Sequence, residues 1–110
     1  MRKNMNKKNI VIMFISFIVL GSLSAKELTI DQKDKVFSIT AVTVKVGDVI
    51  NFRNSDPFFH NIYSLSSIKI FDLGSYKQGE SKSVTFDKPG TVEVNCAIHP
   101  AMKLKVTVEK

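Results

Sequence analysis

The stretch TVEVNCAIHPAMKLKVTV, residues 91–108, lies near the C-terminal end of the sequence. In it, a short segment separates two runs that alternate between apolar and polar residues. Residues 91–95 and 104–108 repeat with a period of two, which is typical of β-strands with one buried face. The short segment holds the only cysteine, Cys96, together with His99 and Met102. Two strands joined by so short a connection predict a turn that curls these three side chains around one point.

The remainder of the chain, from residue 28 onward, shows the same alternation. Gly47-Asp48 and Lys88-Pro89-Gly90 are turn signals between such runs. We expect strands at residues 28–30, 37–39, 42–46, 49–54, 60–65 and 83–86, an apolar-rich segment at 68–73, and a short helical turn between 66 and 79. The pattern predicts an all-β fold, an antiparallel Greek-key β-sandwich of seven to eight strands. The expected core positions are Val44, Val46, Ile50, Phe52, Val84, Phe86, Val92, Val94, Val106 and Val108.

The first 25 residues have a different composition. Four basic residues without an acidic one precede an apolar run at residues 10–20, and residues 21–25 are small apart from Leu23. This is the layout of a secretory signal peptide, and the run is short for a membrane span. We therefore expect a signal peptide at 1–25, one domain at 26–110, and a periplasmic or otherwise exported protein. Cleavage after Ser24 and an uncleaved signal anchor, the one route to membrane attachment, are the alternatives.

The charge balance changes once the leader is set aside. The whole chain carries a net charge of +6, but the leader holds four of its 16 basic residues, which leaves 12 basic against 10 acidic residues. A net charge of +2 without a clustered basic face argues against nucleic-acid binding. One cysteine cannot form an internal disulfide, so a thiol in an exported protein needs another explanation, and metal ligation supplies one.

A second histidine, His60, lies 36 residues before Cys96 at the start of a predicted strand. One thiolate, two imidazoles and a thioether are the ligand set of mononuclear blue-copper sites. We expect His60, Cys96, His99 and Met102 to hold one copper ion. Zinc accepts cysteine and histidine, but a thioether is a poor zinc ligand, and a single cysteine excludes an iron–sulfur cluster.

Four functions compete for this pattern. The favoured one is an electron shuttle that is not an enzyme. A copper carrier or chaperone on the same fold is the main alternative, although the chain's other methionines all lie in the leader. A metal-free sandwich that binds protein or glycan would make the four ligand residues coincidental. A nucleophilic enzyme based on Cys96 and His99 lacks a third orienting residue and gives Met102 no role.

The segments 42–52, 86–90 and 96–102 resemble the cupredoxins, the plastocyanin/azurin-type small blue copper proteins, and the 96–102 spacing is similar to that of the amicyanin branch. The resemblance implies the same four copper ligands, and it implies that the Asn61 side chain hydrogen-bonds the loop near Cys96. It also implies single-electron transfer between Cu(I) and Cu(II) with redox protein partners, such as a c-type cytochrome or a dehydrogenase. We expect a monomer.

His99 lies in the connecting loop, so we expect it near the surface, where its outer ring edge would serve as the electron exit. Pro57, Phe58, Pro100 and Ala101 are expected to form an apolar rim around it. Of Phe58 and Phe59, one is expected to be buried and the other to lie at the rim.

Overall fold

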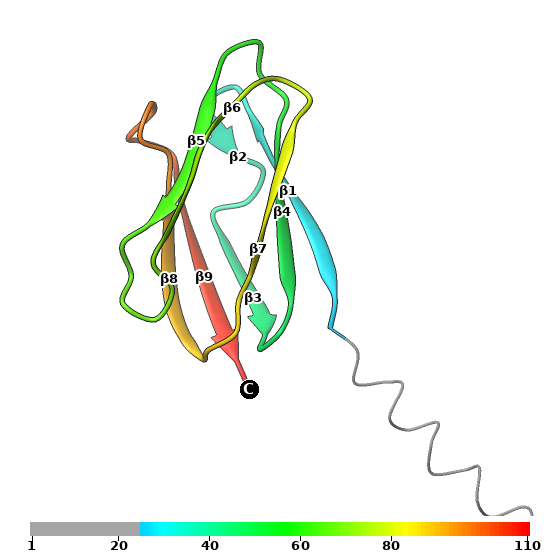
Figure 1. Cartoon of the computed structure of the whole chain (residues 1–110), viewed down its shortest axis with the longest axis vertical. Helices are drawn as coiled ribbons and strands as arrows, with labels where there is room; N and C mark the ends of the chain where they lie inside the picture. Colours follow the sequence, from blue (N-terminus) through cyan, green and yellow to red (C-terminus); the bar gives the residue numbers. More distant parts are fainter. Residues whose placement is uncertain (1–24) are drawn as a thin grey trace, which may run out of the picture.

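The computed structural model describes residues 25–110, so the predicted signal peptide lies outside the described residues except for Ala25. Within this part no helix is long and apolar enough to cross a membrane. The described chain forms nine strands (Figure 1): β1 Glu27–Lys33, β2 Val36–Phe37, β3 Ala41–Lys45, β4 Val49–Asn54, β5 His60–Ser64, β6 Phe71–Tyr76, β7 Ser81–Thr85, β8 Gly90–Asn95 and β9 Lys103–Glu109.

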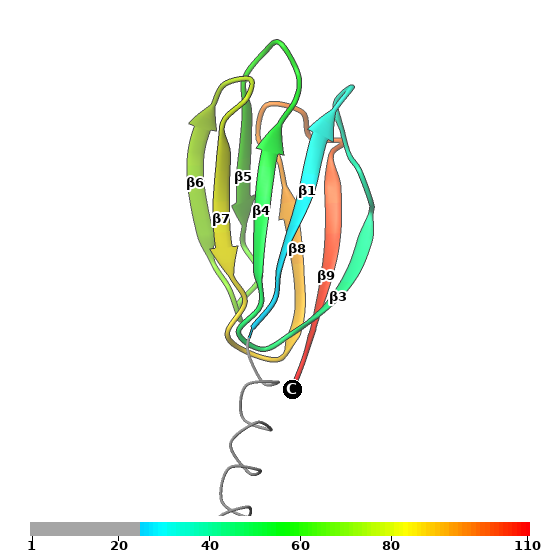
Figure 2. The same cartoon turned by 90° about the vertical axis from the view of Figure 1, so that its right-hand side faces the viewer.

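The strands form two sheets that face each other, which confirms the all-β sandwich (Figure 2). One sheet has the order β2-β1-β4-β7 and the other has the order β3-β9-β8-β5-β6. Both sheets are mixed rather than purely antiparallel, because β1 pairs with β4 and β3 pairs with β9 in parallel. The chain leaves β1, passes through β3 in the opposite sheet, and returns as β4, so β4 enters beside β1 in the same direction.

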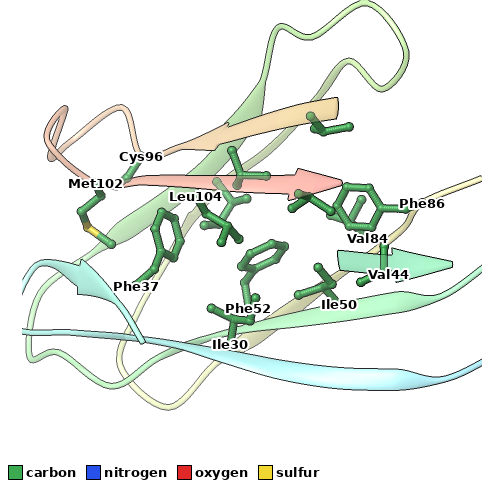
Figure 3. Close-up of a cluster of buried hydrophobic side chains, with 14 of the residues drawn as sticks. Ile30, Phe37, Val44, Ile50, Phe52, Val84, Phe86, Cys96, Met102 and Leu104 are labelled. Atoms are coloured by element: carbon green, nitrogen blue, oxygen red, sulfur yellow. The ribbon is translucent and has the colours of Figure 1, made fainter. Parts of the chain in front are cut away.

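The inward faces of both sheets build one apolar core (Figure 3). Nine of the ten predicted core positions are buried. Val46 is the exception, with 41% of its surface exposed. It follows the last residue of β3, where its N–H bonds the Glu109 carbonyl at 2.8 Å and the chain turns at Gly47, whose φ is +97°. The alternation of apolar residues therefore extends to Val46, one residue beyond the end of the observed strand β3.

The segment expected to hold a helical turn contains strand β6 instead. A single reverse turn, in which the Lys69 N–H bonds the Ser66 carbonyl at 2.9 Å, precedes it. The strand pairs antiparallel with β5, with a register shift between Asn61 and Tyr63. Such bulges re-aim side chains next to functional sites. The strand was hard to predict because it lies at a sheet edge, carries Gly74, and is buried completely only at Tyr76.

The two ends of the sandwich are unlike. The connecting loops at residues 55–59 and 96–102 and the turn between β1 and β2 lie at one end, whereas the start of β1 and the C-terminus lie at the other (Figures 1 and 2). This arrangement brings His60, which begins β5, to the end of the sandwich where the Cys96 loop lies.

Candidate metal centre

Three of the four predicted ligand side chains meet at one point. The Cys96 Sγ lies 3.7 Å from the His60 Nδ1 and 3.9 Å from the His99 Nδ1, and the two Nδ1 atoms are 3.2 Å apart. His60 and Cys96 are completely buried, whereas His99 is half-buried. Residues that are 36 positions apart in the sequence are thus assembled by the meeting of β5 and β8.

The spacing of these atoms fits a bound ion. Metal bonds of about 2.0–2.3 Å to nitrogen and sulfur in a trigonal plane would place the ligand atoms about 3.5–4 Å apart. The distances of 3.2, 3.7 and 3.9 Å are close to that arrangement without any movement of the side chains. One thiolate and two imidazoles form the equatorial donor set of type 1 copper.

Met102 ends the same turn that holds Cys96 and His99. Its backbone N–H bonds the His99 carbonyl at 2.9 Å, which closes the turn between β8 and β9. Its side chain is 1% exposed and belongs to the same buried core as Cys96, and Figure 3 shows both at the same end of that core. A buried methionine in the same turn as Cys96 and His99 suits a single type 1 copper ion rather than zinc.

A buried carboxylate fixes the orientation of His60. The His60 Nε2–H donates to the Asp56 Oδ2 at 2.7 Å, and Asp56 is only 3% exposed. Because a carboxylate can only accept, the proton sits on Nε2 and the Nδ1 lone pair faces the cluster. Burial alone would raise the pKa of Asp56, but the bonds from His60 and from the Lys35 and Asp34 backbones outweigh it and lower the pKa.

Asp56 also ties the metal centre to the turn between β1 and β2. Its Oδ1 accepts the Asp34 N–H at 2.7 Å and its Oδ2 accepts the Lys35 N–H at 3.1 Å. Asp34 and Lys35 have φ values of 57° and 61°, as in a two-residue type I′ hairpin turn. Sequence reasoning missed Asp56. The available signal was an acidic residue four positions before a candidate ligand histidine.

Asn61 holds the cysteine loop, as predicted. Its backbone N–H donates to the Cys96 Sγ at 3.3 Å, and its side-chain Oδ1 accepts the Ala97 N–H at 3.1 Å. The other end of the amide donates to the Asp72 Oδ1 at 3.0 Å. The pKa of Asp72 is lowered by the Gly74 backbone N–H and then by Asn61. Two sides of the amide are therefore fixed, and the cysteine loop is fixed with them.

His99 opens onto an apolar surface. The Phe58 ring lies 5.3 Å from the His99 ring and 5.4 Å from the His60 ring, measured between centroids. Phe58, Phe59 and Ile98 are 37%, 55% and 46% exposed. The expectation that one of the two phenylalanines is buried is therefore wrong.

The reason lies in the polar residues beneath this loop. The buried Asn54 side chain donates from Nδ2 to the Phe58 carbonyl at 2.8 Å, and its Oδ1 accepts the Asp56 N–H at 2.8 Å. The volume below the loop is thus occupied by amide and carboxylate groups, and both rings remain at the surface. Burial, followed by the charges of His60 and Lys35, lowers the pKa of His99. The imidazole is therefore neutral, and able to bind metal, at neutral pH.

A β-sandwich with a cysteine, two histidines and a methionine at one end defines a small copper-binding protein. Residues 24–109 match the family described as copper binding proteins, plastocyanin/azurin family. The chain belongs to this family, and its cofactor is copper.

Two similar proteins are amicyanins. Amicyanin from Paracoccus denitrificans is 28% identical over 89 residues, which cover 74% of this chain and 65% of the relative. Amicyanin-alpha from Methylorubrum extorquens is 32% identical over 76 residues, which cover 66% of this chain and 64% of the relative. The chain therefore spans just under two thirds of the length of each.

Solved structures show the same fold. A Met-to-Ala variant of amicyanin with Cu(I) superposes with a TM-score of 0.71 at 26% identity, covering 76% of this chain and 82% of that one. A Cu-containing nitrite reductase from Thermus scotoductus gives a TM-score of 0.71 at 25% identity. That match covers 76% of this chain but only 22% of the reductase, so it concerns one portion of a larger enzyme.

Proposed function

We propose that this protein is a small exported type 1 copper protein that carries single electrons between redox partners and has no substrate turnover of its own. His60, Cys96, His99 and Met102 would be the ligands of one copper ion. The observation that carries the proposal is the convergence of the Cys96 sulfur and two imidazole Nδ1 atoms, 3.2–3.9 Å from one another.

Bound copper supplies a one-electron couple between Cu(I) and Cu(II). The protein's part is to keep the donor atoms in place in both states. His60 is completely buried and held by Asp56, and the Cys96 sulfur accepts the backbone N–H of Asn61. Because these bonds form within the protein, the donors stay in place when the charge of the site changes, and electron transfer needs little rearrangement.

His99 would be the exit for the electron, since it is the half-buried member of a set whose other members are completely buried. The Phe58 ring lies against it, and the same two loops carry four more exposed apolar residues: Phe59, Ile98, Pro100 and Ala101. A small apolar face suits a transient redox encounter, which buries little area. A c-type cytochrome or a dehydrogenase is the class of partner that we propose.

Two substitutions that each introduce a negative charge test this docking face. Ala101→Glu places a charge within it, and Ser67→Glu places the same charge in the exposed loop between β5 and β6, away from the metal centre. Stopped-flow oxidation of each reduced protein by a c-type cytochrome gives the second-order rate constant. We expect Ala101→Glu to slow the reaction and Ser67→Glu to leave it near wild type. Equal rate constants for the two variants would contradict the proposed docking face.

We further propose that residues 1–25 are a signal peptide and that residues 26–110 form the mature copper domain in the periplasm or another exported compartment. The tripartite composition of the leader supports this proposal. Fractionation of cells that express the whole chain tests it, since the copper protein should leave with the periplasmic fraction.

A further inference from the structure

The backbone of Lys26 is held on both sides before β1 begins. Its N–H donates to the Asp48 Oδ1 at 2.9 Å, and its carbonyl accepts the Val49 N–H at 2.9 Å. The other Asp48 oxygen accepts the Lys45 N–H at 2.8 Å. Asp48 is 7% exposed, so a buried carboxylate joins the start of β1 to the turn between β3 and β4.

Lys26 is also the first residue of the proposed mature domain. Hydrolysis of the Ala25–Lys26 peptide bond by water, in the active site of a leader-cleaving protease, leaves a carboxylate on Ala25 and an α-ammonium group on Lys26. The nitrogen that now donates as a neutral amide would then carry a full positive charge next to Asp48. Hydrogen bonds between charged partners are shorter and about twice as strong as neutral ones.

The surroundings can accommodate that change. A cleft of about 240 Å³ opens beside this contact, lined among others by Lys26, Thr43, Lys45 and Asp48, so water can reach the remaining protons of an ammonium group. The pKa of Asp48 is lowered, mainly by the Lys26 backbone N–H and then by that of Lys45. The carboxylate is therefore charged at neutral pH and available as the counter-ion.

The position of the contact selects one cleavage site. Cleavage after Ser24 would leave the Lys26 nitrogen an amide. Cleavage after Lys26 would remove the contact with Asp48. The new terminus would then be Glu27, which pairs with Val49 at the start of the parallel β1–β4 ladder. Only cleavage after Ala25 makes an ammonium group at the atom that already bonds Asp48.

We propose that removal of the leader after Ala25 creates an ion pair between the new α-ammonium group of Lys26 and the Asp48 carboxylate, and that this pair stabilises the mature domain relative to its precursor. The inference rests on the proposed signal peptide and is independent of the proposed copper site, since the loops at residues 55–59 and 96–102 lie at the opposite end of the sandwich (Figure 1).

The first test is the mass of the exported protein. The whole chain is expressed with its leader, purified from the periplasm, and measured intact. We expect a mass that corresponds to residues 26–110. A product that begins at another residue, or an unprocessed chain, would overturn the proposal.

The second test is a double-mutant cycle on proteins with defined first residues. Thermal unfolding is measured for four proteins: residues 26–110 and residues 24–110, each with and without Asp48→Asn. We expect 26–110 to melt a few degrees above 24–110, and we expect Asp48→Asn to abolish this difference. Equal effects of Asp48→Asn in both backgrounds would overturn the ion pair.

If Asp48→Asn prevents folding, the proposal is tested on residues 26–110 and 24–110 without that substitution. Their melting temperatures must differ, and the difference must shrink in 1 M salt, where the Debye length is about 3 Å. Equal melting temperatures would exclude the pair. Copper absorption spectra of the same proteins distinguish failure of the ion-pair proposal from failure of the copper-site proposal. If the double-mutant cycle shows no coupling but the copper spectrum is intact, only the ion pair is refuted.

Discussion

Replacing Asp56 should weaken both the fold and the metal centre, because three donors meet at its carboxylate. These donors are the His60 Nε2–H at 2.7 Å, the Asp34 N–H at 2.7 Å and the Lys35 N–H at 3.1 Å. Asp56→Ala removes all three bonds. Asp56→Asn keeps one oxygen, which can still accept from His60 and Lys35, but its amide nitrogen then faces the Asp34 N–H as a second donor.

The sizes of the two effects follow from these bonds. Loss of a buried bond to a charged acceptor costs about 1.5–3 kcal/mol, and the two bonds to the hairpin turn add about 0.5–1 kcal/mol each because water can partly replace them. We therefore expect Asp56→Ala to lower the free energy of unfolding of the metal-free protein by about 2.5–5 kcal/mol, and Asp56→Asn by about 1–2 kcal/mol. Loss of the carboxylate that orients a ligand histidine typically weakens metal affinity by about 10- to 100-fold.

Urea denaturation of the metal-free proteins measures the first effect, and competition with a chromophoric Cu(I) chelator measures the second. Asp87→Asn is the matched control, because that side chain is 58% exposed and its ion pair with the Lys69 Nζ has a distance of 3.6 Å. Exposed ion pairs of this kind contribute about 0–1 kcal/mol. An Asp56→Ala protein that is as stable as Asp87→Asn and binds Cu(I) as tightly would contradict the role of this carboxylate.

Three further changes test other parts of the structure. Asn61→Ala removes the acceptor for the backbone of the cysteine loop and should lower the free energy of unfolding in urea by about 1–2 kcal/mol, whereas an unchanged midpoint would show that the loop is held elsewhere. The pKa of Asp48 is lowered, above all by the Lys26 backbone N–H, so its contribution to stability is complete above the ordinary value of 3.8 and is lost as the pH falls through the lower folded value. The stability difference between wild type and Asp48→Asn should therefore narrow below pH 3.8, and a difference independent of pH would contradict this assignment. Gly90 has a φ of +137° and a Cβ added there would lie 2.7 Å from the Ile68 Cδ1, so thermal unfolding should show Gly90→Ala to be less stable by about 1–3 kcal/mol, and equal melting temperatures would argue against strain.

Most of the strands could be predicted because their alternation is local. Residues 42–46, 91–95 and 104–108 have the pattern of half-buried strands without reference to any neighbour, and all are strands to within one or two residues. The mixed pairing could not be predicted in this way. Whether β4 lies parallel or antiparallel to β1 depends on β3 crossing to the other sheet, and no period in the sequence records that crossing.

The candidate site was predictable for a related reason. Cys96, His99 and Met102 lie within seven residues, so a single turn between two strands brings them together, and the chain has only one other histidine to add. Asp56 was missed because its importance depends on a hairpin turn that is more than 20 residues away in the sequence. The exposure of both Phe58 and Phe59 was missed because Asn54 and Asp56 occupy the space into which one of the two rings was expected to pack.

The most direct test of the copper assignment is the visible absorption and electron paramagnetic resonance of the purified protein after addition of Cu(II), with Cys96→Ser as the control. We expect an intense thiolate-to-copper charge-transfer band with narrow hyperfine splitting, both absent in the control. A colourless wild-type protein, or a spectrum that Cys96→Ser leaves unchanged, would contradict the copper assignment.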